Sequence, residues 1–495
     1  MRASGILMHV TSLPGPNGIG AMGKEAYKFL DFLEQAGQSY WQILPLSPTG
    51  YGDSPYQSFS AFAGNPYLID LESLVEENLL RREEVDAIAW DREPNRVDYG
   101  ILYDNRSKIL YKAYERFLGM PNRAFHQFCQ EQTDWLPDYA LFMALKEEFR
   151  GADWQTWPDG LRLRQPAALQ EYREKLKYQI AFQYFLQFKF FQQWKKLRAY
   201  AAGKSIRIIG DVPIYVPLDS ADVWANYELF QLDENRRPRK VAGCPPDAFT
   251  ADGQLWGNPL YNWDKMRQTG YSWWLRRLSA AAKMYDVIRL DHFRGFESYW
   301  AVPAEDDTAK NGSWLPGPGW DFISTIRRQL PSLEFIAEDL GYLTPEVRKL
   351  QKDSGYPGMK VLEFAFDSRE PSDYLPHRYT TDSVCYTGTH DNMTMQQWFD
   401  EAKPDDVAYA KEYMGLNDEE GYVWGMIRGG MSSVSDLFVA QMQDYLTLGG
   451  EARMNFPGTV SNKNWTWRAE AGQITPELAE KIRAMTHLYG RDQVI

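Results

Sequence analysis

Four apolar, strand-like runs of this sequence each carry or precede an acidic side chain. The runs are "IRIIGDVPIYV" (206–216) with Asp211, "YDVIRLD" (285–291) with Asp291, "EFIAEDL" (334–340) with Glu338, and "SVCYTGT" (383–389), which His390 and Asp391 follow. In a parallel barrel the carboxyl ends of the strands meet at one mouth, where catalytic groups lie. We therefore expect these carboxyl groups to form one site.

Arg289 and Asp291 are two residues apart, so on a strand both side chains point to the same face. A guanidinium beside a carboxylate favours the charged form and is expected to lower the pKa of Asp291. An ionised Asp at a half-buried site suits a nucleophile. Taken alone, the pair is also compatible with an internal salt bridge.

Glu338 follows the apolar residues "FIA", so partial burial is expected to raise its pKa and keep it protonated, as a general acid requires. An ionised Asp and a protonated Glu on neighbouring strands match the two-carboxylate design of glycoside cleavage. Metal catalysis is the alternative use of such a mouth. Only His9, His292 and His390 lie near these strand ends, without H-x-H or H-E-x-x-H spacing, so we expect no metal and no other cofactor.

Strand-like runs alternate with helical patterns along most of the chain. The runs are 5–10, 40–46, 206–216, 285–291, 334–340, 360–366, 383–389 and 447–455, and the helical patterns between them include 23–37, 321–331, 344–355 and 432–446. Alternation of this kind predicts an α/β fold, a (β/α)8 TIM barrel. An open doubly wound sheet is the alternative, but "HVTSLPGPNGIG" (9–20) lacks the G-x-G-x-x-G spacing of its phosphate loop.

The spacing of the runs is uneven, which predicts large inserted subdomains within one barrel domain, 1–495. We expect a mainly helical insertion at 47–185, after the second strand, and another at 217–284, after the third. The helical patterns around the first insertion are 106–119, 137–149 and 182–201, and the last of these is apolar nearly all round, as a helix buried on several sides would be.

Composition and charge narrow the class of partner. A net charge of −13 argues against nucleic acid or an anionic membrane as the main partner. Three cysteines without a C-x-x-C spacing indicate a reducing compartment. The start "MRASGILMHV" has too short an apolar stretch for a signal peptide, and no run approaches ~18 apolar residues. We expect a soluble cytoplasmic protein.

Two segments rich in Gly and Pro carry many aromatic side chains, whose flat apolar faces suit sugar rings. The segment 47–70 holds Tyr51, Tyr56, Phe59, Phe62 and Tyr67, and the segment 244–263 holds Phe249, Trp256, Tyr261 and Trp263. We interpret both segments as loops. A binding role and a core role for these rings both remain open.

Short motifs in a fixed order resemble a known family. The stretches "GDVPIYV", "VIRLDHFRG", "FIAEDLG" and "YTGTHDN" resemble the four signature regions of the α-amylase superfamily. The wording of 50–70 and 244–263, together with "RMNFPGT" (453–459) and "NWTWR" (464–468), resembles the 4-α-glucanotransferases called amylomaltases or disproportionating enzymes, glycoside hydrolase family 77. The resemblance runs essentially end to end and implies a barrel without a C-terminal β-sandwich.

The resemblance implies a role for each matching position. Asp291 is similar to the nucleophile, Glu338 to the acid/base, and Asp391 to a third carboxylate that holds the 2- and 3-hydroxyls of the distorted sugar. The residues implied to contact or support the bound glucan are Arg289, His292, His390, Asp211, Tyr56, Ser54, Asp247, Phe249 and Trp256. Tyr51 and Tyr99 resemble a second glucan site, distant from the catalytic one.

The implied activity is transfer of a segment of an α-1,4-glucan to the 4-hydroxyl of another glucan or glucose, through a covalent glucosyl-enzyme. Retention of configuration requires the two catalytic carboxyl groups about 5–5.5 Å apart. Expected partners are maltooligosaccharides, amylose or other α-1,4-glucans, with the protein a monomer or weak homo-oligomer. A plain α-glucan hydrolase and a non-catalytic carbohydrate-binding barrel are the alternatives.

Overall fold

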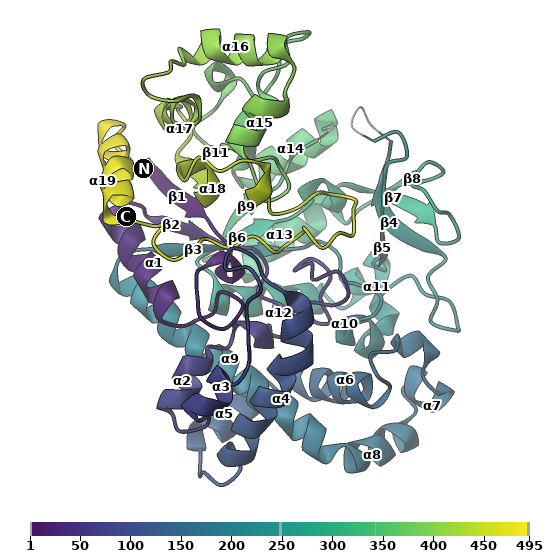
Figure 1. Cartoon of the computed structure of the whole chain (residues 1–495). Coiled ribbons are helices and arrows are strands. Elements are labelled where there is room, and N and C mark those ends of the chain that lie inside the picture. Colours follow the sequence, from purple (N-terminus) through teal and green to yellow (C-terminus); the bar gives the residue numbers. More distant parts are fainter. Residues whose placement is uncertain (1, 247–249, 342, 493–495) are drawn as a thin grey trace.

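The computed structural model describes residues 2–246, 250–341 and 343–492 (Figure 1). Its centre is an eight-stranded parallel sheet in the order β10–β11–β12–β1–β2–β3–β6–β9. The strands are β1 (Ala3–Leu7), β2 (Tyr40–Gln42), β3 (Arg207–Val212), β6 (Val287–Leu290), β9 (Glu334–Ala337), β10 (Gly358–Val361), β11 (Ser383–Tyr386) and β12 (Leu437–Gln441).

The two end strands of this sheet meet, so the sheet closes into a barrel. The Ala337 N–H donates to the Pro357 carbonyl at 2.9 Å, and the Met359 N–H donates to the Asp339 carboxylate at 2.7 Å. Strands of the barrel are covered on both sides, which explains why β1, β6 and β11 are buried at every residue. The predicted (β/α)8 barrel is confirmed.

The prediction for the eighth strand is wrong. We expected a helix at 432–446 and a strand at 447–455, but β12 covers Leu437–Gln441 and pairs with β1 and β11. A one-turn helix, α18 (Met442–Tyr445), follows at once. The short strand and the short helix together carry apolar residues at helix-like spacing, so periodicity alone could not separate them. The segment 447–455 holds only a 3-10 turn, Gly450–Ala452.

Helices pack around the barrel. They include α1 (Lys24–Gln35), α12 (Ser272–Met284), α13 (Gly319–Gln329), α14 (Pro345–Ser354), α17 (Tyr422–Ser432) and α19 (Pro476–Leu488). Three of them, α1, α13 and α14, match the predicted patterns 23–37, 321–331 and 344–355. In α14 the Thr344 side chain accepts from the Val347 N–H, Pro345 opens the helix, and Gly355 ends it with φ 71°. These are the N-cap, first-turn and stop residues that the sequence predicts.

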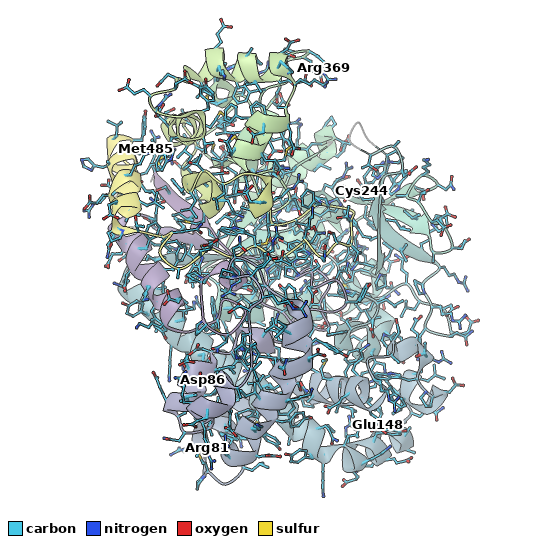
Figure 2. All side chains as sticks on the ribbon, in the orientation of Figure 1. Arg81, Asp86, Glu148, Cys244, Arg369 and Met485 are labelled. Atoms are coloured by element: carbon cyan, nitrogen blue, oxygen red, sulfur yellow. The ribbon has the colours of Figure 1, made fainter. Side chains whose placement is uncertain are left out.

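Between β2 and β3 the chain forms a group of helices, seen in the lower part of Figure 1. They are α2 (Leu71–Glu76), α3 (Arg82–Asp86), α4 (Tyr99–Phe117), α5 (Arg123–Glu131), α6 (Leu136–Glu148), α7 (Asp159–Arg162), α8 (Pro166–Lys175) and the long α9 (Lys177–Gly203). Asp86 and Glu148 mark this group in Figure 2. Helix α9 buries Phe182, Phe185 and Trp194, so the prediction of burial on several sides is confirmed.

A second, four-stranded antiparallel sheet lies beside the barrel, in the order β5–β4–β7–β8. It comprises β4 (Lys240–Cys244), β5 (Gln254–Pro259), β7 (Ser298–Pro303) and β8 (Ser313–Pro316), and Cys244 is labelled on it in Figure 2. The sequence did not predict this sheet. The interpretation of 244–263 as a loop is therefore wrong over β5, where Trp256 stands on a strand.

Two kinds of element are absent from the described residues. Among the described residues no strand follows β12. None of the helices that the structure describes is both long and apolar enough to cross a membrane.

Candidate active site

The predicted acidic residues lie at the carboxyl ends of their strands. Asp211 is in β3, Asp291 directly follows β6, Glu338 directly follows β9, and Asp391 is in the turn after β11. His292 adopts a left-handed conformation with φ 51°, which turns the chain sharply away from β6. The strand ends thereby bring side chains far apart in sequence to one mouth.

Arg289 joins two of the carboxylates. Its Nη1 donates to Asp211 Oδ2 at 2.7 Å and to Asp291 Oδ1 at 3.0 Å. The Arg289 and Asp211 side chains are 4% and 1% exposed, whereas that of Asp291 is 27% exposed. The predicted common face of Arg289 and Asp291 is confirmed, and only Asp291 of the two carboxylates is open enough to meet a ligand.

Arg289 favours the charged form of Asp291, as expected, but the expected net lowering of the Asp291 pKa is wrong. Burial opposes the charge and outweighs the stabilising Arg289 guanidinium, and Glu338 and Asp391 add repulsion, so the pKa of Asp291 rises to about 6. Arg289 also serves Asp211, whose pKa burial raises to about 6. One guanidinium therefore cannot hold both carboxyl groups in the ordinary acidic range.

Glu338 is held in place by backbone donors. The His292 N–H donates to Oε2 at 2.7 Å and the Leu340 N–H to Oε1 at 2.9 Å. Burial raises the pKa of Glu338, although Arg289 and these two N–H groups favour the ionised form. The predicted direction is confirmed. Asp291 and Glu338 repel each other's negative charge, and Arg289, which hydrogen-bonds to Asp291, favours that charge on Asp291.

Asp391 is the most acidic carboxyl of the mouth. His390 Nε2 lies 3.3 Å from Oδ2, and Asn455 Nδ2 donates to Oδ1 at 2.7 Å. Burial opposes its charge, but the His390 charge and these hydrogen bonds lower the pKa of Asp391 to about 2. Its side chain is 46% exposed, so an ionised acceptor faces the open mouth.

Tyr56 connects two sides of the mouth. Its hydroxyl donates to Asp211 Oδ2 at 2.8 Å, and its ring stacks on His390 with centroids 5.0 Å apart. Ser54 Oγ accepts from the Tyr56 N–H at 3.2 Å and so shapes the same loop. The structure therefore brings Tyr56, His390 and Asp211 together.

Trp256 lies at the rim of the mouth. Its ring meets the His292 ring edge-on with centroids 4.8 Å apart, and Tyr215 is the next ring along. Burial and the nearby Arg294 lower the pKa of His292 to about 3, so its imidazole is neutral at pH 7. Asp247 and Phe249, predicted to contact the glucan, lie outside the described residues.

Tyr51 and Tyr99, predicted to form a second glucan site, differ in their surroundings. Tyr51 is 95% exposed, and the Tyr99 hydroxyl donates to the Trp465 carbonyl at 3.0 Å. Tyr261 and Trp263, left open between core and binding, are 1% and 8% exposed and belong to the core. The glycine- and proline-rich sequence around these aromatic residues did not show which rings are buried and which are exposed.

Sequence reasoning missed three residues that complete the mouth. Asn455 holds the Asp391 side chain, and Arg453 donates to the Asp391 carbonyl at 2.9 Å. The Trp465 ring lies 5.8 Å from that of Tyr56 and 6.0 Å from that of His390. The only sequence signal for these three residues was the resemblance of 453–459 and 464–468 to the family. In the described ranges, no group of three or more His, Cys, Asp or Glu could hold a metal ion.

The barrel and its mouth define a class of protein: (β/α)8 enzymes with a carboxylate cluster of the kind that cleaves or transfers glycosides. The profile of glycoside hydrolase family 77, described as 4-alpha-glucanotransferase, matches residues 8–474. The chain belongs to this family, which confirms the resemblance read from its motifs.

Individual relatives match over their whole length. A 4-alpha-glucanotransferase from Clostridium butyricum is 48% identical over 98% of this chain and 100% of its own. One from Thermus thermophilus is 48% identical over 98% of each chain. The amylomaltase from Streptococcus agalactiae, solved in complex with acarbose, has a TM-score of 0.97 at 43% identity, over 99% of this chain and 100% of its own.

Proposed function

We propose that this protein is a 4-α-glucanotransferase that disproportionates α-1,4-glucans by a retaining double displacement. Family membership supports the activity. The assignment of the catalytic residues rests on one observation, the different partners of Asp291 and Glu338 at the mouth. Asp291 has a guanidinium at 3.0 Å to stabilise its charge, and the neighbouring Glu338 has a raised pKa and, among the described residues, hydrogen bonds from the His292 and Leu340 N–H groups rather than from a guanidinium.

In the first step Asp291 attacks the anomeric carbon while Glu338 donates its proton to the leaving 4-oxygen. This step forms the Asp291–glucosyl ester and releases the shortened glucan. In the second step Glu338, now a carboxylate, removes the proton from the 4-hydroxyl of an acceptor glucan. That oxygen displaces Asp291, and the α-linkage is restored.

The other residues of the mouth act on the sugar or on the catalytic groups. We assign the ionised Asp391 to the hydroxyls of the sugar at the cleavage point, with His390 as its charge partner. Asp211 and Tyr56 hold Arg289 and His390, and the neutral His292 contacts the same sugar. Tyr51 and Tyr99 are assigned to a second glucan site, and the protein to the cytoplasm.

The activity is expected to follow a bell-shaped pH profile. Asp291 must be ionised, and its pKa is about 6, so kcat/KM should fall as the pH drops below about 6. Glu338 must be protonated, so kcat/KM should also fall on the alkaline side. Rates with maltotriose across pH test both limbs, and a profile without an acid limb near pH 6 would count against the role of Asp291.

Trp256→Ala is expected to weaken acceptor binding and increase loss of the intermediate to water. Water is present at about 55 M, so a transferase must bind its acceptor well and restrict water at the ester. An aromatic stacking face is worth ~1–3 kcal/mol by analogy with base stacking. The measurement is the ratio of transfer to hydrolysis as the acceptor concentration varies.

Trp320→Ala is the matched control, because Trp320 is 47% exposed on α13. It should leave acceptor affinity and the transfer ratio unchanged. If Trp256→Ala behaves like this control, Trp256 does not form an acceptor site.

Product analysis with maltotriose tests the proposed activity itself. A glucanotransferase yields glucose and a ladder of longer maltooligosaccharides with little gain in total reducing ends. A plain hydrolase, the second candidate, yields glucose and maltose with a steady gain in reducing ends. Products without the ladder would reject the proposed function in favour of that candidate.

A further inference from the structure

Beneath the mouth, a buried carboxylate outside the proposed catalytic set holds both ends of the segment that carries Asp391. Asp444, in α18, is 0% exposed. Its Oδ2 accepts from the Thr387 hydroxyl at 2.5 Å, and its Oδ1 accepts from the Met395 N–H at 2.7 Å. Thr387 directly follows β11, and Met395 opens α15 (Met395–Glu401), so the two contacts bracket the turn 388–394.

A second carboxyl group faces the same turn from the opposite side. Glu363 lies just after β10, whereas Asp444 lies just after β12, and β11 runs between these two strands. The Met393 N–H and the Asn392 side chain are hydrogen-bond donors that favour its charged form. Its Oε2 atom is fully buried and has no hydrogen-bond partner among the described residues.

The turn also has contacts of its own. Asn392 Oδ1 accepts from the Thr389 N–H at 2.9 Å and from the Thr389 hydroxyl at 2.8 Å, and Gln441 Nε2 donates to the Met393 carbonyl at 3.2 Å. The Asp391 N–H donates to Thr389 Oγ1 at 3.3 Å, a contact within the turn. Arg453 and Asn455 hold the Asp391 carbonyl and carboxylate from above. At the two junctions of the turn, with β11 and with α15, the residues Thr387 and Met395 both donate to Asp444.

We propose that Asp444 is a positioning residue for Asp391, and that Glu363 supports the same turn as a neutral acid. This inference rests on the proposed function, because it assigns Asp391 to the reacting sugar. Both oxygens of Asp444 accept from donors, so the ionised form fits its site and an amide would place N–H groups against an O–H or N–H.

The protonation of Glu363 follows from its surroundings. Burial raises the pKa of Glu363 to about 8, although Arg453 lowers it, and Asp444 adds repulsion. At pH 7 the side chain is a neutral acid, and an uncharged amide of the same shape can replace it.

Four variants separate positioning from simple structural support. Thr387→Val removes one donor to Asp444 at constant shape and should lower kcat for maltotriose about 10–100-fold, by analogy with outer-shell partners of metal ligands. KM should change little, because an interaction realised only in the transition state appears in kcat. Thr387→Ser restores the hydroxyl and should restore kcat. Asp444→Asn should resemble Thr387→Val, whereas Glu363→Gln should keep wild-type kcat.

Asp70→Asn is the matched control, because Asp70 is a buried carboxylate that caps α2 far along the chain from Asp391. It should alter the melting temperature and leave kcat unchanged. The inference is overturned if Thr387→Val keeps wild-type kcat, if Thr387→Ser fails to restore it, or if Glu363→Gln loses as much kcat as Thr387→Val. A wild-type protein without a maltooligosaccharide ladder would instead reject the proposed function.

Discussion

Asp291→Asn is expected to abolish disproportionation of maltotriose while the protein stays folded. The substitution removes the attacking oxygen at nearly constant volume, and loss of a covalent nucleophile costs more than about 10³-fold in kcat. Arg289 keeps its 2.7 Å contact with Asp211, so its buried charge stays paired. The rate of appearance of maltotetraose and longer products measures the effect.

The stability of this variant provides an internal control. The pKa of Asp291 is raised to about 6, so at pH 7 its charge destabilises the folded state, and an amide should not lower the melting temperature. Asp264→Asn, at a side chain 86% exposed, should leave activity unchanged. Residual activity of Asp291→Asn above about a hundredth of wild type would contradict its role as nucleophile.

Glu338→Gln is expected to be nearly inactive on maltotriose yet active in its first step on α-glucosyl fluoride. Fluoride leaves without a proton, so the missing acid matters little for that donor. The N–H groups of His292 and Leu340 donate to separate oxygens of Glu338, at 2.7 and 2.9 Å, so the amide oxygen can accept from only one of them and the amide NH2 faces the other. The substitution nevertheless keeps the volume of the side chain nearly constant. The burst of fluoride release measures the first step.

The pH dependence of that burst adds an independent check. In Glu338→Gln an acid limb should remain, because Asp291 still titrates, but it should move below pH 6, because the Glu338 charge no longer raises the pKa of Asp291. The alkaline limb should vanish. Equal impairment of Glu338→Gln on both donors at every pH would exclude Glu338 as the acid/base.

Sequence patterns predicted the barrel because its strands are apolar on both faces and end in charged residues. The same rule failed for β12, where Leu437–Ala440 run directly into Met442 and Tyr445 at helical spacing. The small sheet was missed because its strands are not continuously apolar and buried. In "QLWGNP" of β5 the first four residues are half-buried or exposed, and β8 has no buried residue. Only the tertiary pairing with β4 distinguishes β5 from a turn.

For the site, the sequence predicted which carboxyl groups meet but not how they are held. Asn455 reaches Asp391 across 64 residues of chain, and no local pattern encodes that contact. The pKa of Asp291 was predicted in the wrong direction because two residues of sequence showed Arg289 but not the depth of burial or the facing carboxylates. The direction of a pKa shift in a site follows only when the burial of the group and all the charges around it are known.

Trapping the covalent intermediate tests the central claim most directly. Glu338→Gln, mixed with α-maltotriosyl fluoride, should form the glycosyl ester quickly and break it down slowly, because no base activates an acceptor. Mass spectrometry of the digested protein should find a glucan attached to the peptide that contains Asp291, and none when Asp291→Asn is added. A glucan on Asp391 or another residue, or fluoride turnover without any adduct, would contradict the double displacement through Asp291.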